Sequence, residues 1–343
     1  MERIMLGSVT RIADLTVPLE DLEARSTDDW SFGDVVVAEV TRAPLTRPDA
    51  FELRDGRATA PMKGDLLVGA LARRFATLEA TGSFEAVDDD GIMHLLSRAG
   101  CFGALTSRSR FSPQLHELRY RGHVIRDGRP VRLREHRREG TGKAFDLPVV
   151  LIVGTSMSAG KTHAGRVAVR ALTRLGHRVV GAKLTGAGRR GDSLAFGDAG
   201  AEWVCDFMDA GLPTTVCPPE EYRSAISELL SHIASAAPDA TAAVIEAGAS
   251  PLEPYNGATL VDLLDERIGL TILCASDPYA VEGIRNAWGR TFDLVAGPTA
   301  NTAAGVHLVR VLCGLPAIDL MEERGHEELE RMLRTAIPGP GTR

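Results

Sequence analysis

The sequence predicts an α/β protein with two domains, a C-terminal domain built on a parallel sheet and a smaller β-rich N-terminal domain. Three observations support this prediction. The length of 343 residues exceeds the roughly 100–200 residues that one domain usually contains. The residue pattern changes near residue 140, and after that point apolar strand segments alternate with helical segments. Such alternation is typical of a parallel sheet that is covered by helices on both faces.

The N-terminal part reads as short strands joined by turns. Apolar runs at 35–40 and 65–71 are separated by Pro, Gly and Asp. One helix is expected at about 91–99, and two alternating stretches predict a hairpin that turns at Asp127-Gly128. We therefore expect residues 1–143 to form the β-rich domain. The strands of this domain could form a small barrel. The domain could serve in substrate binding or in oligomerisation, and the sequence leaves both roles open.

After a linker at 139–143, the pattern becomes regular. A continuous apolar run at 148–153 predicts a buried strand, followed by a glycine loop and a helix at 161–175. Gly176 can end that helix in the left-handed conformation. Further strands are expected at 178–182, 242–245, 269–275 and 292–296, so residues 144–336 form the second domain. The tail at 337–343 is expected to be disordered.

Charge and composition limit the classes of partner. The net charge of −7 provides no general attraction to nucleic acid or to an anionic membrane. No stretch approaches the ~18 apolar residues of a membrane span, and the start lacks the apolar segment of a signal peptide. We expect a cytoplasmic protein that acts on a small molecule and forms a homo-oligomer. The five cysteines are widely spaced, which favours small buried side chains over a disulfide framework.

The glycine loop is the most informative motif. A loop between a buried strand and a helix presents backbone N–H groups and the positive end of the helix dipole, and so forms a phosphate cradle. Within it, Lys161 would reach the β and γ phosphates and the Thr162 hydroxyl would bind Mg²⁺. The two outer glycines are separated by one residue more than in the common pattern. The expected nucleotide-binding residues of this loop are Gly154, Thr155, Ser156, Met157, Ser158, Ala159, Gly160, Lys161 and Thr162.

Polar residues at the ends of the other predicted strands are the candidate partners of this loop. Glu246 follows the strand 242–245, where a carboxylate can face a metal ion or cap the next helix. Lys183 follows another strand and could hold the γ phosphate or a substrate carboxylate, or lie at the surface. Asp192 and Asp198 lie in a glycine-rich stretch, and either could be a second metal ligand or a turn former.

These residues resemble the dethiobiotin synthetase branch of P-loop proteins. The resemblance is carried by the loop, by Gly181-Ala182-Lys183-Leu184-Thr185-Gly186, by an Asp-Ser pair and by Val244-Ile245-Glu246-Ala247-Gly248. It implies that ATP and Mg²⁺ are the cofactors. By position, it further implies phosphate contacts from Lys161 and Lys183, magnesium contacts from Thr162, Asp192 and Glu246, and an adenine contact from Asn301.

A second resemblance is to the P-loop family that contains D-glutamate N-acetyltransferase. It is carried by the motifs Trp203-Val204-Cys205-Asp206-Phe207, Glu246-Ala247-Gly248-Ala249-Ser250, Pro254-Tyr255-Asn256-Gly257 and Asp277-Pro278. The similar region covers about residues 147–320. The loop interior departs from the acidic and threonine-bearing interior of dethiobiotin synthetase. It also lacks the second lysine on which the dimeric switch ATPases of cell division and partition depend, which favours small-molecule chemistry.

The sequence therefore leaves two classes of function open. The first is a Mg-ATP-dependent ligase or kinase that transfers a phosphoryl group to a small, carboxylate-bearing substrate, with Lys161 and Lys183 as catalytic residues. Within catalysis, an N-acyltransferase is the alternative. The second class is a nucleotide-driven switch or metallochaperone. His163 and His177 lie far from every cysteine in the sequence, a spacing that does not suggest a soft metal site. The choice between ATP and GTP also stays open.

Overall fold

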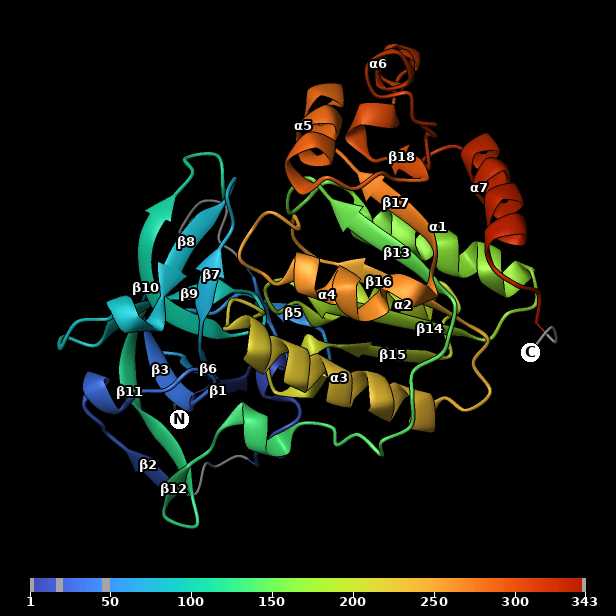
Figure 1. Ribbon diagram of the computed structural model, residues 1–343. Coiled ribbons are helices and arrows are strands. Elements are labelled where there is room, and N and C mark those ends of the chain that lie inside the picture. The colour runs from blue at the N-terminus through green and yellow to red at the C-terminus, as the bar shows by residue number, and fades with distance from the viewer. Residues whose placement is uncertain (1–2, 17–20, 45–49, 341–343) are drawn as a thin grey trace. The chain divides into compact units, whose positions relative to one another are not determined.

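The computed structural model describes residues 3–16, 21–44 and 50–340 (Figure 1). The chain forms two compact units. The first comprises Met1–Arg138, Ala187–Gly191 and Phe207–Val216, and the second comprises Glu139–Gly186, Asp192–Asp206 and Cys217–Arg343. Two short segments from the second half of the chain thus belong to the first unit. Within the described residues, no helix has the length and apolar character that a membrane span requires.

The first unit is β-rich, as predicted. Its main sheet has the order β1-β6-β3-β11-β9-β10-β8-β7, and β10 also pairs with β6. This additional pairing closes β6, β3, β11, β9 and β10 into a ring around a core that contains Phe51, Phe102 and Leu118. The strands are β1 (Ile4–Leu6), β2 (Asp21–Glu23), β3 (Val35–Arg42), β4 (Phe51–Glu52), β5 (Ala58–Thr59), β6 (Leu66–Leu71), β7 (Arg73–Phe75), β8 (Ala80–Ser83), β9 (Ile92–Ser97), β10 (Cys101–Arg108), β11 (Glu117–Arg126) and β12 (Arg129–Pro130).

The predicted hairpin is confirmed, whereas the predicted helix at 91–99 is wrong. Strands β11 and β12 pair at Arg126 and Arg129, and Asp127 and Gly128 both have positive φ, as a tight hairpin turn requires. The segment expected to be helical is strand β9, which pairs with β10 on one side and β11 on the other. A short apolar run buried on both faces does not distinguish a strand from a helix, and here the cross-strand pairing decides.

Polar contacts connect the segments Ala187–Gly191 and Phe207–Val216 to the N-terminal part of the first unit. The Glu52 carboxylate is buried and accepts hydrogen bonds from Ser8 Oγ (2.5 Å) and from the backbone N–H groups of Arg190 (2.6 Å) and Gly191 (2.9 Å). Arg11 forms an ion pair with Asp209 at 2.8 Å. A buried carboxylate is stable only when its oxygens are paired, so the first of these segments completes the hydrogen bonding of the Glu52 carboxylate.

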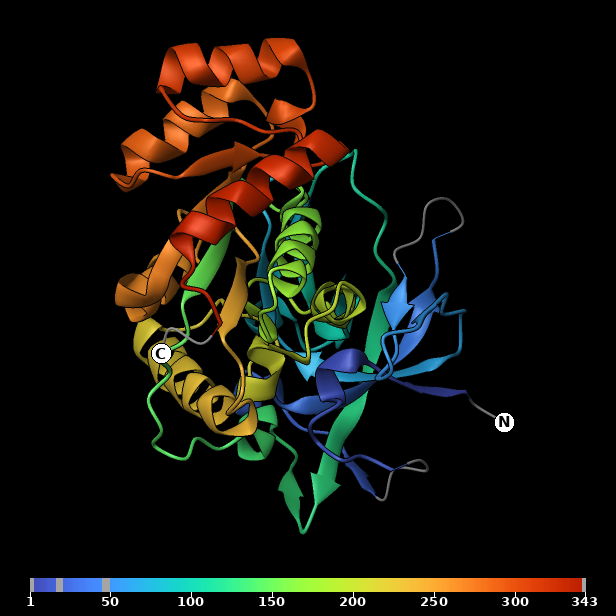
Figure 2. The same cartoon turned by 90° about the vertical axis from the view of Figure 1, so that its right-hand side faces the viewer.

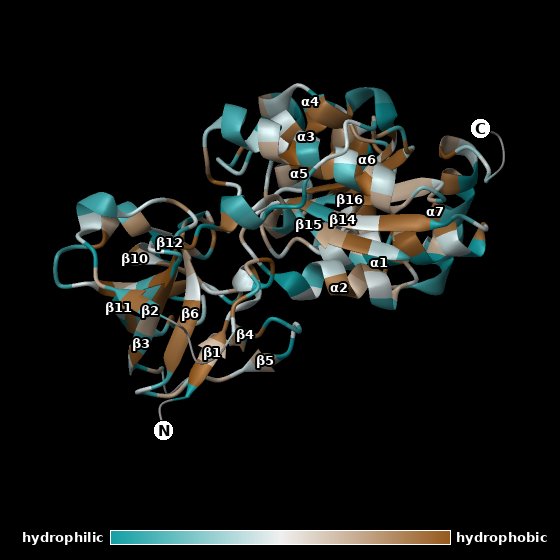
Figure 3. Ribbon diagram, turned by 90° about the horizontal axis from the view of Figure 1, so that it is seen from below, coloured by the Kyte–Doolittle hydropathy of each residue, from teal (hydrophilic) through white to brown (hydrophobic). Residues whose placement is uncertain are grey.

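The second unit contains the predicted parallel sheet. The strand order is β15-β14-β16-β13-β17-β18, and every pairing is parallel. Helix α1 lies on one face, and α3 and α4 lie on the other (Figure 3). The elements are β13 (Val149–Gly154), α1 (Lys161–Arg174), β14 (Val179–Thr185), α2 (Arg190–Asp198), β15 (Trp203–Asp206), α3 (Pro219–Ala236), β16 (Ala242–Ala247), α4 (Gly257–Leu264), β17 (Ile268–Cys274), α5 (Pro278–Trp288), β18 (Leu294–Ala296), α6 (Ala303–Cys313) and α7 (Glu323–Ala336).

Helix α7, shown in red, lies beside α1 and covers the same side of the sheet (Figure 2). The chain continues beyond α7 into the core, because Ile337 is buried there at 1% exposure. The expectation of a disordered tail is therefore wrong at Ile337. Its last residues, Gly341 to Arg343, lie outside the described residues.

Phe196 fixes the packing of α1 and α2 on the sheet. Its ring is fully buried and lies against two glycines, Gly165 of α1 and Gly181 of β14. A Cβ atom added at Gly165 would come within 2.5 Å of the ring, and one at Gly181 would come within 2.5 Å of Phe196 Cβ. Both glycines are therefore required by the close approach of an aromatic side chain.

This packing predicts opposite effects for two helical glycines. We expect Gly165→Ala to lower the free energy of unfolding by up to about 2 kcal/mol, because an overpacking cost of about 1–3 kcal/mol outweighs the gain of about 1 kcal/mol in helix propensity. Gly283→Ala in α5 is the matched control, since a Cβ atom there meets nothing within 4 Å, and it should stabilise the protein. Urea unfolding of both variants measures the difference. A Gly165→Ala protein as stable as the control would contradict the packing argument.

Candidate functional site

The glycine loop connects β13 to α1 and folds back around the side chain of Lys161. Thr155 N–H donates to Cys274 O at 3.0 Å, which ties the start of the loop to the end of β17. Ser158 and Gly160 have φ values of 64° and 91°, a left-handed conformation that reverses the chain direction before the helix begins. A Cβ atom at Gly154 would lie 2.8 Å from Lys161 Cδ. The loop is therefore a tight cradle with the lysine at its centre.

Lys161 is buried and charged groups surround it. Its Nζ donates to Ser156 O at 2.6 Å, and the residue is 4% exposed. Burial lowers the pKa of Lys161, and the negative charge of nearby Glu246 opposes that shift. A cation that has lost most of its water gains free energy from any anion that enters the loop.

Strand register brings Lys183 and Glu246 side by side. Lys183 of β14 pairs with Glu246 of β16, and Glu246 pairs in turn with Ile152 of β13. Residues directly opposite each other in neighbouring strands point to the same face of a sheet. At the start of α1, the Thr162 hydroxyl donates to Glu246 Oε2 at 3.1 Å. The Glu246 carboxylate thus lies between the start of α1 and strand β14.

Helix α2 supplies the second carboxylate. Asp192 Oδ2 accepts from Lys183 Nζ at 2.5 Å, and their side chains are 12% and 7% exposed, respectively. Burial raises the pKa of the Glu246 carboxyl, the positive charges of Lys183 and Lys161 lower it, and Asp192 raises it further. The two lysines and two carboxylates compensate one another, so the cluster carries no net charge when all are ionised.

The other two polar residues considered from the sequence lie outside this cluster. Asp198 is exposed at the end of α2. Asn301 lies in the loop after β18. In the amide orientation that satisfies both its nitrogen and its oxygen, the nitrogen donates to Asp319 Oδ1 (3.2 Å) and to Gly297 O (3.1 Å). The Asn301 loop nevertheless adjoins the phosphate loop, because a Cβ atom at Gly297 would lie 2.5 Å from Ala159 O.

The sequence did not single out two residues close to the loop. Glu253 contributes negative charge that favours the charged form of Lys161, and Cys274 is a buried, neutral thiol beside the start of the loop. Glu253 lies in the loop after β16, where its Oε2 accepts from Ser250 N–H at 2.9 Å. Cys274 ends β17 opposite Gly154, and burial raises its pKa to about 12. Their positions, at the end of β17 and in the loop after β16, lie beside the two neighbours of β13 and could have indicated both.

The oxygen donors near the loop match the needs of a magnesium ion that phosphate groups also bind. Within the described residues, no three His, Cys, Asp or Glu side chains gather into a metal cage. Thr162, Glu246 and Asp192 offer one hydroxyl and two carboxylates. Mg²⁺ usually takes one or two protein carboxylates and completes its shell with water and substrate phosphates, so this donor set fits it.

The parallel sheet, the loop after its central strand and the helix that follows define a P-loop NTPase fold. No protein-family model matches the chain, and no curated protein matches its sequence. The solved structures similar to it include hydrogenase maturation factor HypB from Archaeoglobus fulgidus, with 17% identity and a TM-score of 0.38, covering 55% of this chain and 90% of that one.

Another similar structure is the signal recognition particle 54 kDa protein from Aeropyrum pernix K1 in complex with GDP. It has 17% identity and a TM-score of 0.34, and the alignment covers 55% of this chain and 47% of that one. Likeness at this level carries no information on activity, which depends on the residues of the site.

The buried ion pair predicts different effects for the two aspartates of α2. We expect Asp192→Asn to lower the free energy of unfolding by about 3–5 kcal/mol, because it removes one partner of a buried ion pair and leaves Lys183 undercompensated. Asp198→Asn changes an exposed residue of the same helix and should shift it by less than about 0.5 kcal/mol. Urea unfolding compares the two variants. Equal stabilities would show that Lys183 does not depend on Asp192.

Proposed function

We propose that this protein is a magnesium-dependent, ATP-using enzyme that transfers a phosphoryl group to a small, carboxylate-bearing substrate. The observation that carries the proposal is the convergence of Lys161, Thr162, Lys183, Asp192 and Glu246 at the carboxyl edge of a parallel sheet. Ligands of open α/β sheets bind outside this edge. The Mg-nucleotide, when bound, supplies the phosphoryl group for transfer.

In this proposal, Lys161 and the loop hold the phosphates. The buried ammonium of Lys161 now donates to Ser156 O, and a phosphate oxygen is a stronger acceptor than a carbonyl. Enzymatic phosphoryl transfer depends mainly on positioning and on charge neutralisation. The role of Lys161 is therefore to neutralise negative charge at a place where water has already been removed.

Thr162, Glu246 and Asp192 would hold the magnesium ion. The Thr162 hydroxyl and Glu246 are already in contact, so two of the donors are ordered before the ion arrives. Lys183 would hold the substrate carboxylate or the transferring group as a point charge. The present ion pair of Lys183 with Asp192 supports a carboxylate as the ligand of this ammonium. This is why we assign a carboxylate-bearing substrate.

A substrate screen tests the proposal and separates an enzyme from a nucleotide-driven switch. We expect ADP release from ATP and Mg²⁺ to increase when the correct small carboxylic acid is added, and hydroxylamine to trap the activated carboxyl group as a hydroxamate. Lys161→Ala should lower this turnover by at least about a hundredfold, because it removes a preorganised charge. ATP hydrolysis that no acid in a broad panel stimulates, without any hydroxamate, would instead favour a switch.

Glu246→Gln tests the metal assignment. The amide keeps the shape of the side chain but is a poor ligand for a hard cation. We expect turnover at saturating Mg²⁺ to fall by at least about tenfold, since even changes to outer-shell partners of a metal have effects of this size. Glu221→Gln is the control, because Glu221 is exposed on α3. A magnesium titration of the rate that is identical for both variants would remove Glu246 from the metal site.

A further inference from the structure

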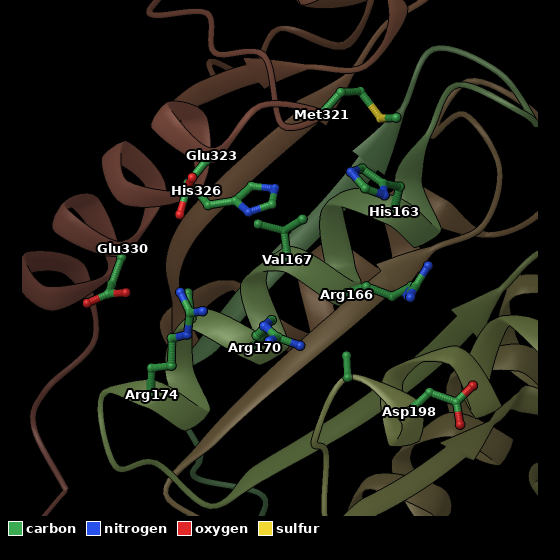
Figure 4. Close-up of a pocket in the computed structure, with 12 residues that line it drawn as sticks. His163, Arg166, Val167, Arg170, Arg174, Asp198, Met321, Glu323, His326 and Glu330 are labelled. Carbon is green, nitrogen blue, oxygen red and sulfur yellow. The ribbon is translucent and has the colours of Figure 1, made fainter.

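A pocket lies on the second unit, between α1, α7 and the end of α2 (Figure 4). Its volume is about 520 Å³. None of the residues assigned above to phosphate, metal or substrate lines it. Arg166, Arg170 and Arg174 of α1 line one side, and His326 of α7 faces them (Figure 4). The pocket is therefore separate from the proposed nucleotide site, although both involve α1.

The three arginines form a row of positive charge along one face of α1. They are spaced four residues apart, so they point to the same side of the helix and extend over about 12 Å along its axis. All three are exposed. Like charges at this spacing repel each other. The row therefore costs stability unless negative groups compensate it.

No side chain within residues 3–16, 21–44 and 50–340 forms an ion pair or hydrogen bond with any of these three arginines. Some other arginines of the same unit are paired. Arg178 binds both Glu202 and Asp239 at 2.8 Å. The guanidinium groups of the row are thus available to a ligand. Because each presents a planar fork of donors, phosphate or carboxylate groups are the ligands that suit them.

Carboxylates at the same pocket restrict the kind of anion. Glu323, Glu330 and Asp198 also line it, and Glu330 is paired with Arg334 at 3.0 Å. These negative groups would repel a long polyanion that extends past the arginines. They would accept hydrogen bonds from hydroxyl or amino groups of a compact ligand. The pocket therefore suits a small molecule that carries both anionic groups and donors.

The wall of the pocket is held in place before any ligand binds. His163 Nε2 and His326 Nε2 lie 2.8 and 2.9 Å from the same acceptor, Leu320 O. This shared carbonyl joins the start of α1 to the start of α7 and orders both imidazole rings. A preordered wall lowers the entropy that a ligand must lose on binding.

We propose that this pocket is a second ligand site, which binds a small molecule with two or more phosphate or carboxylate groups through Arg166, Arg170 and Arg174. The site does not depend on the proposed phosphoryl transfer. It would be occupied whether the phosphate loop serves an enzyme or a switch.

Titration calorimetry with inorganic tripolyphosphate tests the site. The Lys161→Ala protein is used so that the phosphate loop does not bind the probe. We expect saturable binding that Arg170→Gln weakens by about tenfold or more, because each arginine contributes charge-assisted hydrogen bonds. Arg223→Gln is the matched control, since Arg223 is an exposed arginine of α3, and should bind as tightly as its parent. No saturable binding, or equal affinity in the two variants, would overturn the proposal.

Two further measurements make the result specific. If Lys161→Ala does not fold by circular dichroism, the same Arg170→Gln and Arg223→Gln comparison is made in otherwise wild-type protein whose loop is saturated with magnesium nucleotide. Citrate is titrated beside tripolyphosphate to distinguish a carboxylate ligand from a phosphate ligand, and Arg170-dependent binding of either supports the site. Tighter Arg170-dependent binding of a single-stranded oligonucleotide than of both small anions would overturn the assignment to a small molecule.

Discussion

The mutual compensation of buried charges at the carboxyl ends of β14 and β16 is the constraint on which the second unit depends. Removing a single ammonium or carboxylate from water costs several kcal/mol, so Lys183 and Glu246 are stable there only together and with their neighbours. Strand register places these two side by side. Helix α2 must then bring Asp192 to the lysine, and α1 must bring Thr162 to the glutamate. Sheet, helices and loop are therefore held in one arrangement by the same electrostatic requirement.

A neutral, desolvated cluster of this kind is suited to exchanging partners. Each polar group is now satisfied by a group of the protein that a ligand could replace: Ser156 O for Lys161, Asp192 for Lys183, and the Thr162 hydroxyl for Glu246. Replacement needs little reorganisation, because the groups are already close and already dehydrated, which is the condition under which fixed charges stabilise a transition state best. An enzyme and a nucleotide switch would share this arrangement and differ in what occupies the space beside Lys183.

The sequence was sufficient where one pattern had one structural meaning. The apolar run before Gly154 and the helix after Gly160 are β13 and α1, because strand, glycine loop and amphipathic helix leave no other order. It was insufficient where pairing with distant strands decides the secondary structure. The run at 91–99 is a strand because it pairs with β10 and β11. The residue pattern alone left Asp192 and Asp198 as equal candidates, and it was the resemblance to dethiobiotin synthetase that assigned the metal role to Asp192. The spacing of the α1 arginines does not reveal that they lack partners among the described residues.

The division of the first unit into three segments has a consequence for synthesis. A ribosome makes the chain from the N-terminus, so the closed ring of strands is complete in sequence long before Ala187–Gly191 and Phe207–Val216 exist. Until then the Glu52 carboxylate lacks the Arg190 and Gly191 N–H groups, which are separated from it by 138 and 139 residues. Before those segments are made, the Glu52 carboxylate keeps the hydrogen bond from Ser8 Oγ and needs water at the positions that the two N–H groups later fill. The chain has to reach the middle of the other unit before the first can reach its final stability.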